Sequence, residues 1–162
     1  MSLKREEWPA KALGFIAPSV IEMAQKIREI CDTAMVPSPD PEAHVRFTGG
    51  SSLHCVGADG GLKSQATDLF ILDNSASARV WALVQSVESV GGFGMYFDTK
   101  LGGEKQTLIH IDTRDERLLW MCPDEPKRRY VYYNNNPVYF LNLLSKEPVS
   151  YTHLTLPTKR IV

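Results

Sequence analysis

Two segments decide how the chain is expected to fold: residues 51–68, SSLHCVGADGGLKSQATD, and residues 108–114, LIHIDTR. Each combines a histidine with an aspartate in a setting typical of a strand or a strand edge. Together they supply two imidazoles and a carboxylate, which is a donor set typical of zinc. Because three protein ligands leave a fourth position for water, the pattern favours a catalytic site over a structural one, and we expect a metallohydrolase.

The size and charge of the chain limit its function class. Its 162 residues, 43% of them hydrophobic, are enough for one compact domain and too few for two of ordinary size. A net charge of -1, without basic runs interleaved with aromatics, argues against a nucleic-acid partner. No apolar run approaches the roughly 20 residues needed to span a bilayer. Three widely spaced cysteines without a CxxC pair indicate reduced thiols.

The two ends of the chain carry processing information. Residues 1–15, MSLKREEWPAKALGF, lack the apolar region and cleavage site of a signal peptide, so we expect cytoplasmic synthesis, which also holds for a phage enzyme released to the cell wall by lysis. Residues 149–162, VSYTHLTLPTKRIV, resemble translated read-through of a sequencing-library adaptor and are treated as a non-native tail, so His153 receives no role. Residues 1–148 remain as a single domain, expected to be monomeric.

Hydrophobic periodicity predicts an α+β arrangement. Apolar residues recur at intervals of three and four after Pro18 and predict an amphipathic helix over residues 20–34. A second helix is predicted from Ser75 or Ser77 to about Val90, ended by Gly91-Gly92, and a short one over residues 138–144. The three prolines of residues 36–42 predict an exposed connection. Strands are predicted over residues 44–48, 66–72, 93–98, 107–111 and 117–121, with a polar hairpin loop over residues 99–106.

Several short motifs follow one another between residues 16 and 120: Ser52-x-His54, Ala66-x-Asp68-Leu69, Gly92-Phe93-Gly94-x-Tyr96, His110-x-Asp112-x-Arg114 and Trp120. Their order resembles the D-alanyl-D-alanine metallopeptidase family in its phage and bacterial cell-wall branch, which belongs with lysostaphin-type enzymes and the Hedgehog signalling domain. The resemblance implies a Zn²⁺ ion held by His54, Asp68 and His110. It also implies an α+β fold in which a small antiparallel sheet carries the zinc site and helices flank the sheet.

The same resemblance implies a function. We expect a zinc-dependent peptidase that hydrolyses peptide bonds of bacterial cell-wall peptidoglycan, with a stem or crosslink peptide as partner, in the manner of a D-Ala-D-Ala carboxypeptidase or an endolysin. The family also includes scaffolds that do not cut. The alternative is therefore a non-catalytic zinc-bearing module that binds peptidoglycan or another protein.

The chain departs from the usual pattern of the family in two places. The first histidine and the aspartate are usually seven residues apart, within S-x-H-x-x-G-x-A-x-D, whereas here they are fourteen apart. The extra residues fall in a glycine-rich loop, and such lengthening costs only about 0.6 kcal/mol per doubling. Asp59 in that loop is the competing ligand, but Asp68 is preferred because a strand holds metal geometry better. The second departure is Gly49-Gly50-Ser51, which lacks an arginine that handles substrate in relatives.

The residues around the last histidine leave the catalytic roles open. Relatives often place a glutamate three residues before that histidine, and here Thr107 takes the position. Asp112, on the same strand face as His110, is either the general base or the acceptor that fixes the His110 ring. Glu104 is a weaker candidate base. Arg114 either balances Asp112 or binds a substrate carboxylate, and Tyr96 either donates to an oxyanion or packs in the sheet.

Two other residues next to these motifs have simpler interpretations. His44 is expected to be a hydrogen-bonded polar residue without a metal role. Cys55 follows His54 and suggests a cysteine hydrolase, but neighbours in a strand face opposite ways, and a buried cysteine is commonly inert. The zinc hypothesis is therefore preferred.

Overall fold

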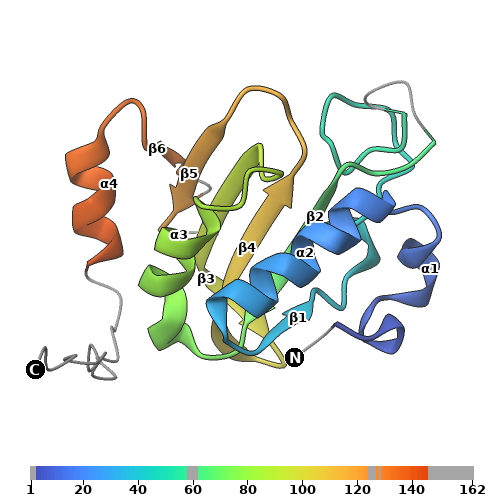
Figure 1. Ribbon diagram of the computed structural model, residues 1–162, viewed down its shortest axis with the longest axis horizontal. Coiled ribbons are helices and arrows are strands. Elements are labelled where there is room, and N and C mark those ends of the chain that lie inside the picture. Colours follow the sequence, from blue (N-terminus) through green and yellow to red (C-terminus); the bar gives the residue numbers. More distant parts are fainter. Residues whose placement is uncertain (1–2, 58–61, 124–126, 128, 146–162) are drawn as a thin grey trace, which may run out of the picture.

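The computed structural model describes residues 3–57, 62–123, 127 and 129–145. The described strands are β1 (Met35–Pro37), β2 (Ala66–Ile71), β3 (Gly92–Leu101), β4 (Glu104–Asp112), β5 (Leu118–Cys122) and β6 (Val131–Tyr132). The α-helices are α1 (Ala10–Leu13), α2 (Pro18–Cys31), α3 (Ser77–Val84) and α4 (Pro137–Leu144), and the 3-10 turns are η1 (Arg5–Glu7), η2 (Pro41–Ala43) and η3 (Asn74–Ala76). The strands form one six-stranded sheet in the order β1-β2-β4-β3-β5-β6. Helices α2 and α3 lie across one face of this sheet, and α4 lies beside its β6 edge (Figure 1).

The expected α+β class is confirmed, but the small antiparallel sheet is a wrong prediction in two respects. The sheet has six strands, and β3 and β5 run parallel to each other. The parallel pair follows from the connections. Strand β4 returns along one side of β3 as a hairpin, and a short link then reverses the chain and places β5 on the other side of β3. Whether this arrangement is the Hedgehog-like fold that the sequence suggests stays a prediction.

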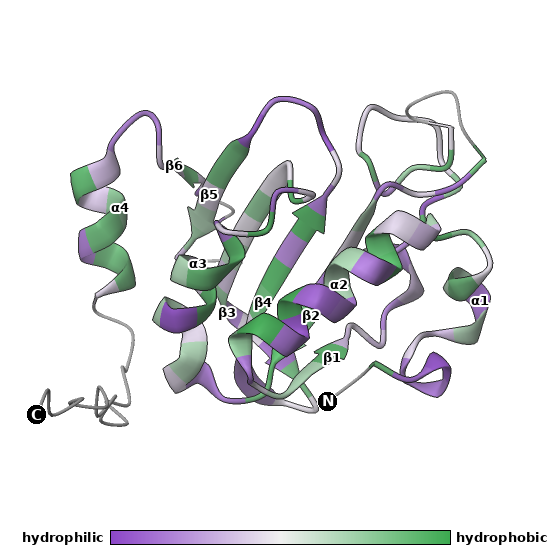
Figure 2. Ribbon diagram, in the orientation of Figure 1, coloured by the Kyte–Doolittle hydropathy of each residue, from purple (hydrophilic) through white to green (hydrophobic). Residues whose placement is uncertain are grey.

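Helix α2 confirms the amphipathic pattern expected over residues 20–34. Pro18 is the first helical residue, where its missing N–H costs nothing, and the helix ends before Asp32, which has a left-handed φ of 42°. Val20, Ala24 and Ile27 lie on its inner face and are fully buried. Figure 2 shows hydrophobic residues concentrated on the central strands, with hydrophobic and hydrophilic stretches interspersed on α2. Burial of one helix face against the sheet therefore holds α2 in place.

Helix α3 is shorter than predicted. It ends at Val84, because Ser86 turns back and bonds the Leu83 carbonyl through both its amide and its hydroxyl. Val87 and Val90 are buried nonetheless, in the turns that follow. Gly92 begins β3 and does not end a helix. None of the helices in the described part of the chain combines the length and apolar content that crossing a membrane requires.

The central hairpin is longer than predicted. Residues expected to form a loop over 99–106 instead continue the strands, and only Gly102 and Gly103 remain as the turn between β3 and β4. Both glycines have positive φ, 60° and 91°. A two-residue turn of this kind requires the left-handed region, which glycine enters without a steric penalty.

The segment between α2 and β2 differs most from expectation. The proline-rich connection begins with an edge strand, β1, paired antiparallel to β2. The strand predicted over residues 44–48 is absent apart from a single bridge pair between Arg46 and Cys55. The backbone amides of His44 and Val45 donate to the Pro41 carbonyl, so they are not available to a neighbouring strand.

The three cysteines form no disulfide, as expected for reduced thiols. All three are buried: Cys31 in the hydrophobic core, Cys55 in the loop before β2, and Cys122 at the end of β5. Burial raises the pKa of the Cys31 thiol to about 11, because the apolar surroundings disfavour the thiolate.

The hairpin turn predicts a difference between two glycine substitutions. Gly103→Ala should lower the free energy of unfolding by about 1 kcal/mol, because alanine is strained in the left-handed region. Gly14→Ala is the matched control, since Gly14 has φ -68° and no atom lies within 4 Å of an added Cβ. It should leave stability unchanged or raise it by up to about 1 kcal/mol. Urea unfolding of the two variants checks this, and equal losses would contradict it.

Candidate metal centre

The site is built on the sheet face opposite the helices. Antiparallel pairing sets Asp68 of β2 beside His110 of β4, and His110 beside Gly94 of β3. The same row continues through Trp120 of β5 to Tyr132 of β6. Because side chains alternate along each strand, these residues share one face while Leu69, Ile109 and their neighbours fill the core on the other. One cross-strand row therefore carries two of the expected ligands.

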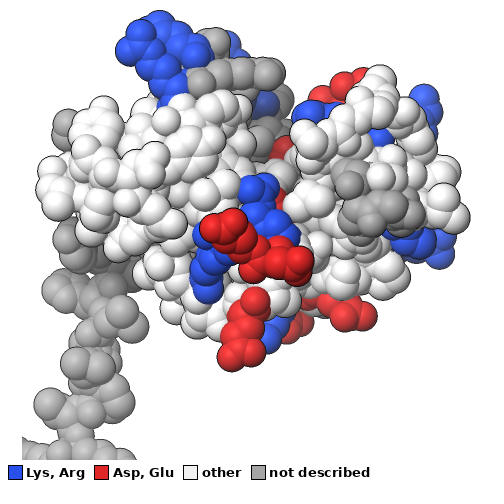
Figure 3. All heavy atoms as spheres, turned by 90° about the horizontal axis from the view of Figure 1, so that it is seen from above, with Lys and Arg blue, Asp and Glu red and all other residues white. Residues whose placement is uncertain are grey.

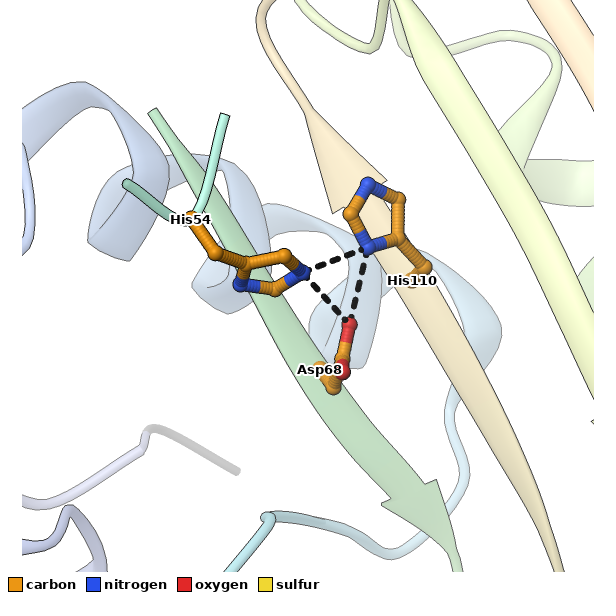
Figure 4. Close-up of side chains that lie close together, drawn as sticks. All are labelled: His54, Asp68 and His110. Carbon is orange, nitrogen blue, oxygen red and sulfur yellow. Dashed lines mark hydrogen bonds and ion pairs between the residues drawn. The ribbon is translucent and has the colours of Figure 1, made fainter. Parts of the chain in front are cut away.

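The structure brings together His54, Asp68 and His110 (Figure 4). Nε2 of His54 lies 3.0 Å from Nδ1 of His110 and 3.4 Å from Oδ1 of Asp68. Nδ1 of His110 lies 2.9 Å from the same Asp68 oxygen. The three side chains converge from a loop and two paired strands, as the sequence predicted.

His54 reaches this point from outside the sheet. Its carbonyl accepts from the Arg46 amide at 2.8 Å, and the Leu53 carbonyl accepts from Gln65 at 2.8 Å. These two backbone hydrogen bonds anchor the loop at His54 and at the residue before it. The residues that lengthen the spacing to Asp68 follow in sequence, and Asp59 lies outside the described residues.

The donor geometry fits a tetrahedral metal ion. Bonds of about 2.0–2.1 Å at tetrahedral angles separate neighbouring donor atoms by roughly 3.3 Å, which is close to the separations found here. Two imidazoles and one carboxylate suit several divalent metals, so the group could bind a metal ion whose identity the geometry leaves open. The buried Nδ1 of His54 has no hydrogen-bond partner among the described residues. Its Nε2 is the atom that faces the other two donors.

Asp112 lies on the far side of the His110 ring from the other two ligands and contacts both His110 and Arg114. Its Oδ2 is 2.9 Å from Nε2 of His110, and Arg114 Nε donates to both carboxylate oxygens at 2.8 and 3.0 Å. The carboxylate is fully buried and lies directly over Gly92, where a Cβ would overlap it. A carboxylate on the far nitrogen of a ligating histidine fixes the orientation of the ring. These contacts match the orienting role that the sequence left open.

The charges of this cluster stabilise one another. Burial opposes ionisation of Asp68, but hydrogen bonds from His110 and His54 outweigh it and hold the pKa of this carboxyl well below its usual range. The pKa of Asp112 is lowered in the same way, against burial, by His110 and Arg114. Burial disfavours the His110 imidazolium, yet the two carboxylates raise its pKa to about 9. Both aspartates are therefore ionised at neutral pH.

An aromatic wall borders the group on the side of β5. The Trp120 indole lies against Gly94, where a Cβ would overlap it, with its ring centroid 5.2 Å from that of His110. Its Nε1 donates to the Tyr96 hydroxyl at 3.0 Å, and the Arg114 guanidinium stacks on it at 5.3 Å. Burial raises the pKa of Tyr96, so its hydroxyl keeps its proton. The two glycines of the Gly92-Phe93-Gly94 motif thus make room for Asp112 and Trp120.

The group opens into a cavity of about 570 Å³. The three expected ligands and three of the expected catalytic residues line it: His54, Asp68, Tyr96, His110, Asp112 and Arg114. Glu104 and Thr107 do not. Thr107 is buried on the helix face, 3.0 Å from the Ser77 hydroxyl, so it stands where no side chain could reach the metal group.

Other lining residues had no sequence signal that would have singled them out. They are Arg46, Ser51, Leu108, Leu118, Tyr130 and Tyr132, together with loop residues beside His54. Strand β6 has only two residues, too few for a periodic pattern. Figure 3 shows one face of the molecule, on which acidic and basic side chains lie next to each other and most of the surface is uncharged.

His44 and Cys55 lie near the site without belonging to the ligand group. His44 is confirmed as a buried, hydrogen-bonded histidine, with Nδ1 2.6 Å from Thr67 Oγ1 and Nε2 2.7 Å from the Ser38 carbonyl. Cys55 is buried, and no hydrogen bond joins it to His54 in the described part of the chain. Cys55 does not line the cavity, which leaves the cysteine-hydrolase hypothesis without geometric support.

Comparisons of the chain with protein-family models, with curated proteins and with solved structures found no match.

The burial of His44 predicts that the stability of the folded protein depends on pH. Burial lowers its pKa below the ordinary 6.5, so the folded protein holds it neutral while the unfolded chain takes up a proton. The resulting stability is present above pH 6.5 and is lost as pH falls toward the folded pKa, by at most about 1.4 kcal/mol per pH unit.

Urea unfolding of the metal-free protein at pH 7 and pH 5 measures this effect, with His44→Gln as the variant that cannot titrate. The difference in unfolding free energy between wild type and variant should be larger at pH 7 than at pH 5. A difference that is the same at both pH values would show that His44 is not held neutral.

Proposed function

We propose that the protein is a zinc-dependent peptidase that hydrolyses peptide bonds of bacterial cell-wall peptidoglycan. One observation carries the proposal: His54, Asp68 and His110 converge at the wall of an open cavity, with the residue types and chain order of the D-alanyl-D-alanine metallopeptidases that the sequence resembles. A closed structural zinc site has four protein ligands, whereas three ligands beside a cavity leave room for water and substrate.

The chemistry of the donor set supports hydrolysis. Zinc held by two imidazoles and a carboxylate is a Lewis acid that polarises a substrate carbonyl and activates water at neutral pH. The protein side chains then have three tasks, which are to hold the ligands in place, to stabilise the negative charge that develops on the carbonyl oxygen, and to move a proton to the leaving amine.

Tyr96 is suited to the second task. Its oxygen accepts from Trp120, and among the described residues nothing accepts from its own O–H, which can donate toward the cavity. Its raised pKa keeps that proton in place at neutral pH. A donor already oriented by a buried indole requires little rearrangement when charge develops.

Asp112 is better placed to orient His110 than to act as a base. Its carboxylate contacts His110 on one side and Arg114 on the other, and its lowered pKa makes it a weak proton acceptor. Arg114 is engaged in the same pair, which favours its charge-balancing role over substrate binding. Asp68 is the other acidic residue among those lining the cavity, and it faces the two imidazoles.

This engagement of both carboxylates supports a second candidate function. A module that binds cell-wall peptide or another protein through the metal would need no general base. Both carboxylates among the described residues that line the cavity have hydrogen-bond partners, which supports a function that needs no general base.

Metal loading and cleavage distinguish the two functions. The purified full chain should bind about one zinc ion, and it should cleave peptidoglycan or D-Ala-containing peptides in a manner abolished by a chelator and restored by zinc. Asp68→Asn should lose both properties. The control is Asp98→Asn, which changes a half-buried aspartate paired with Lys105 outside the cavity and should lose neither. Stoichiometric zinc without cleavage of any wall peptide at any pH would leave the binding module, and failure to bind metal would contradict both.

The role of Asp112 is open to a separate test. If the residue orients His110, Asp112→Asn should weaken zinc binding by about 10–100-fold, and activity should return largely at saturating zinc. If it is the base, zinc affinity should change little and activity should collapse even at saturating zinc. Zinc titration against a competing chelator, combined with turnover at saturating metal, separates the two results.

A further inference from the structure

His44 lies close to the candidate metal centre of His54, Asp68 and His110 in the fold. It connects two segments that position these ligands, strand β2 and the chain around Ser38. Its side chain is buried, and its two nitrogens contact Ser38 and Thr67. A carbonyl oxygen can only accept, so Nε2 carries the ring proton and donates to Ser38. Nδ1 then accepts from the Thr67 hydroxyl. Each partner fixes the direction of the other bond.

Both partners of His44 control the backbone at Asp68. Thr67 immediately precedes Asp68 on β2, and its side chain points to the helix face while Asp68 points to the metal group. The amide of Ser38 donates to the Asp68 carbonyl at 3.1 Å. The peptide units on both sides of Asp68 are therefore connected to one imidazole.

The same imidazole also lies at the start of the segment that holds His54. Two residues after His44, the Arg46 amide donates to the His54 carbonyl at 2.8 Å, and the Arg46 carbonyl accepts from Val56 at 2.9 Å. This segment is not part of a regular strand, so the sheet alone does not fix where it lies relative to β2. His44 provides a side-chain connection between the two.

We propose that His44 and Thr67 are positioning residues that set the separation of His54 from Asp68 and thereby the affinity of the group for its metal. The proposal rests on the proposed metal site and is independent of whether the protein cleaves peptides. Neither residue contacts the metal donors directly. Their effect acts through the backbone of β2 and through the segment from His44 to Arg46.

The chain offers a matched pair of substitutions for the test. Thr67→Val removes the hydroxyl that bonds His44. Thr107→Val removes the hydroxyl of another buried threonine on the helix face of the same sheet, which bonds Ser77 at the other end of β2 and β4. Both changes are nearly isosteric and both remove one buried hydrogen bond, but only Thr67 connects to the chain around the metal group.

The measurements are the zinc dissociation constant, by chelator competition, and the urea midpoint of the zinc-free protein. Thr67→Val should weaken zinc binding about tenfold, whereas Thr107→Val should change it less than about twofold with a comparable shift in midpoint. If Thr67→Val does not fold, Thr67→Ala and Thr67→Ser replace it. Both lose the methyl group, and only Thr67→Ser, which keeps the hydroxyl, should retain wild-type affinity.

Equal zinc affinities of Thr67→Val and Thr107→Val, or of Thr67→Ala and Thr67→Ser, would overturn the positioning role while leaving the metal site intact. A wild-type protein that binds no zinc would overturn the site and this inference together. The two failures are therefore distinguishable.

Discussion

The antiparallel pairing of β2 with β4 places Asp68 opposite His110, and the rest of the site is arranged around that pair. A shift of one residue in this register would place the two side chains on opposite faces of the sheet, one of them toward the helices. The register is held from the other face, where Leu69, Ile109 and Ile111 are fully buried against the helices. The position of two candidate metal ligands is thus set by apolar packing on the opposite side of the sheet, and the site depends on the core.

Parts of this arrangement follow from local sequence. The helix after Pro18 carries a periodic pattern and the strand around Asp68 an apolar run. The strand forms where expected, and the helix forms with an end at Cys31, before the predicted end at residue 34. The convergence of His54, Asp68 and His110 was predicted from residue types and motif order, and the structure brings the three together. The inserted residues between His54 and Asp68 did not disturb this, because the loop is anchored at Leu53 and Gln65.

Other parts depend on contacts that periodicity does not encode. The chain reverses direction after β4, and this reversal decides which strand lies on the open side of β3. The parallel pairing of β5 and the place of Tyr132 in the cavity wall could therefore not be inferred. A strand was expected at His44 because its neighbours alternate, yet the backbone there turns back on itself. The role of Asp112 required knowing that Arg114 folds back onto it, which the spacing of two residues permits and does not dictate.

The site is also a balanced set of charges. Two aspartates alternate with His110 and Arg114 along a continuous chain of hydrogen bonds that runs from Asp68 to the guanidinium. Buried charges are tolerated when each has an opposite partner within bonding distance. Removing any one member leaves a neighbour uncompensated, so substitutions within this chain should not be additive.

The burial of all three cysteines bears on where such a protein can work. Oxidation and disulfide exchange proceed through an exposed thiolate, so buried thiols react slowly with oxidants, and the pKa of Cys31 is also raised. A fold that keeps its sulfur atoms out of contact with solvent can pass from a reducing compartment into oxidising surroundings without cross-linking to other chains.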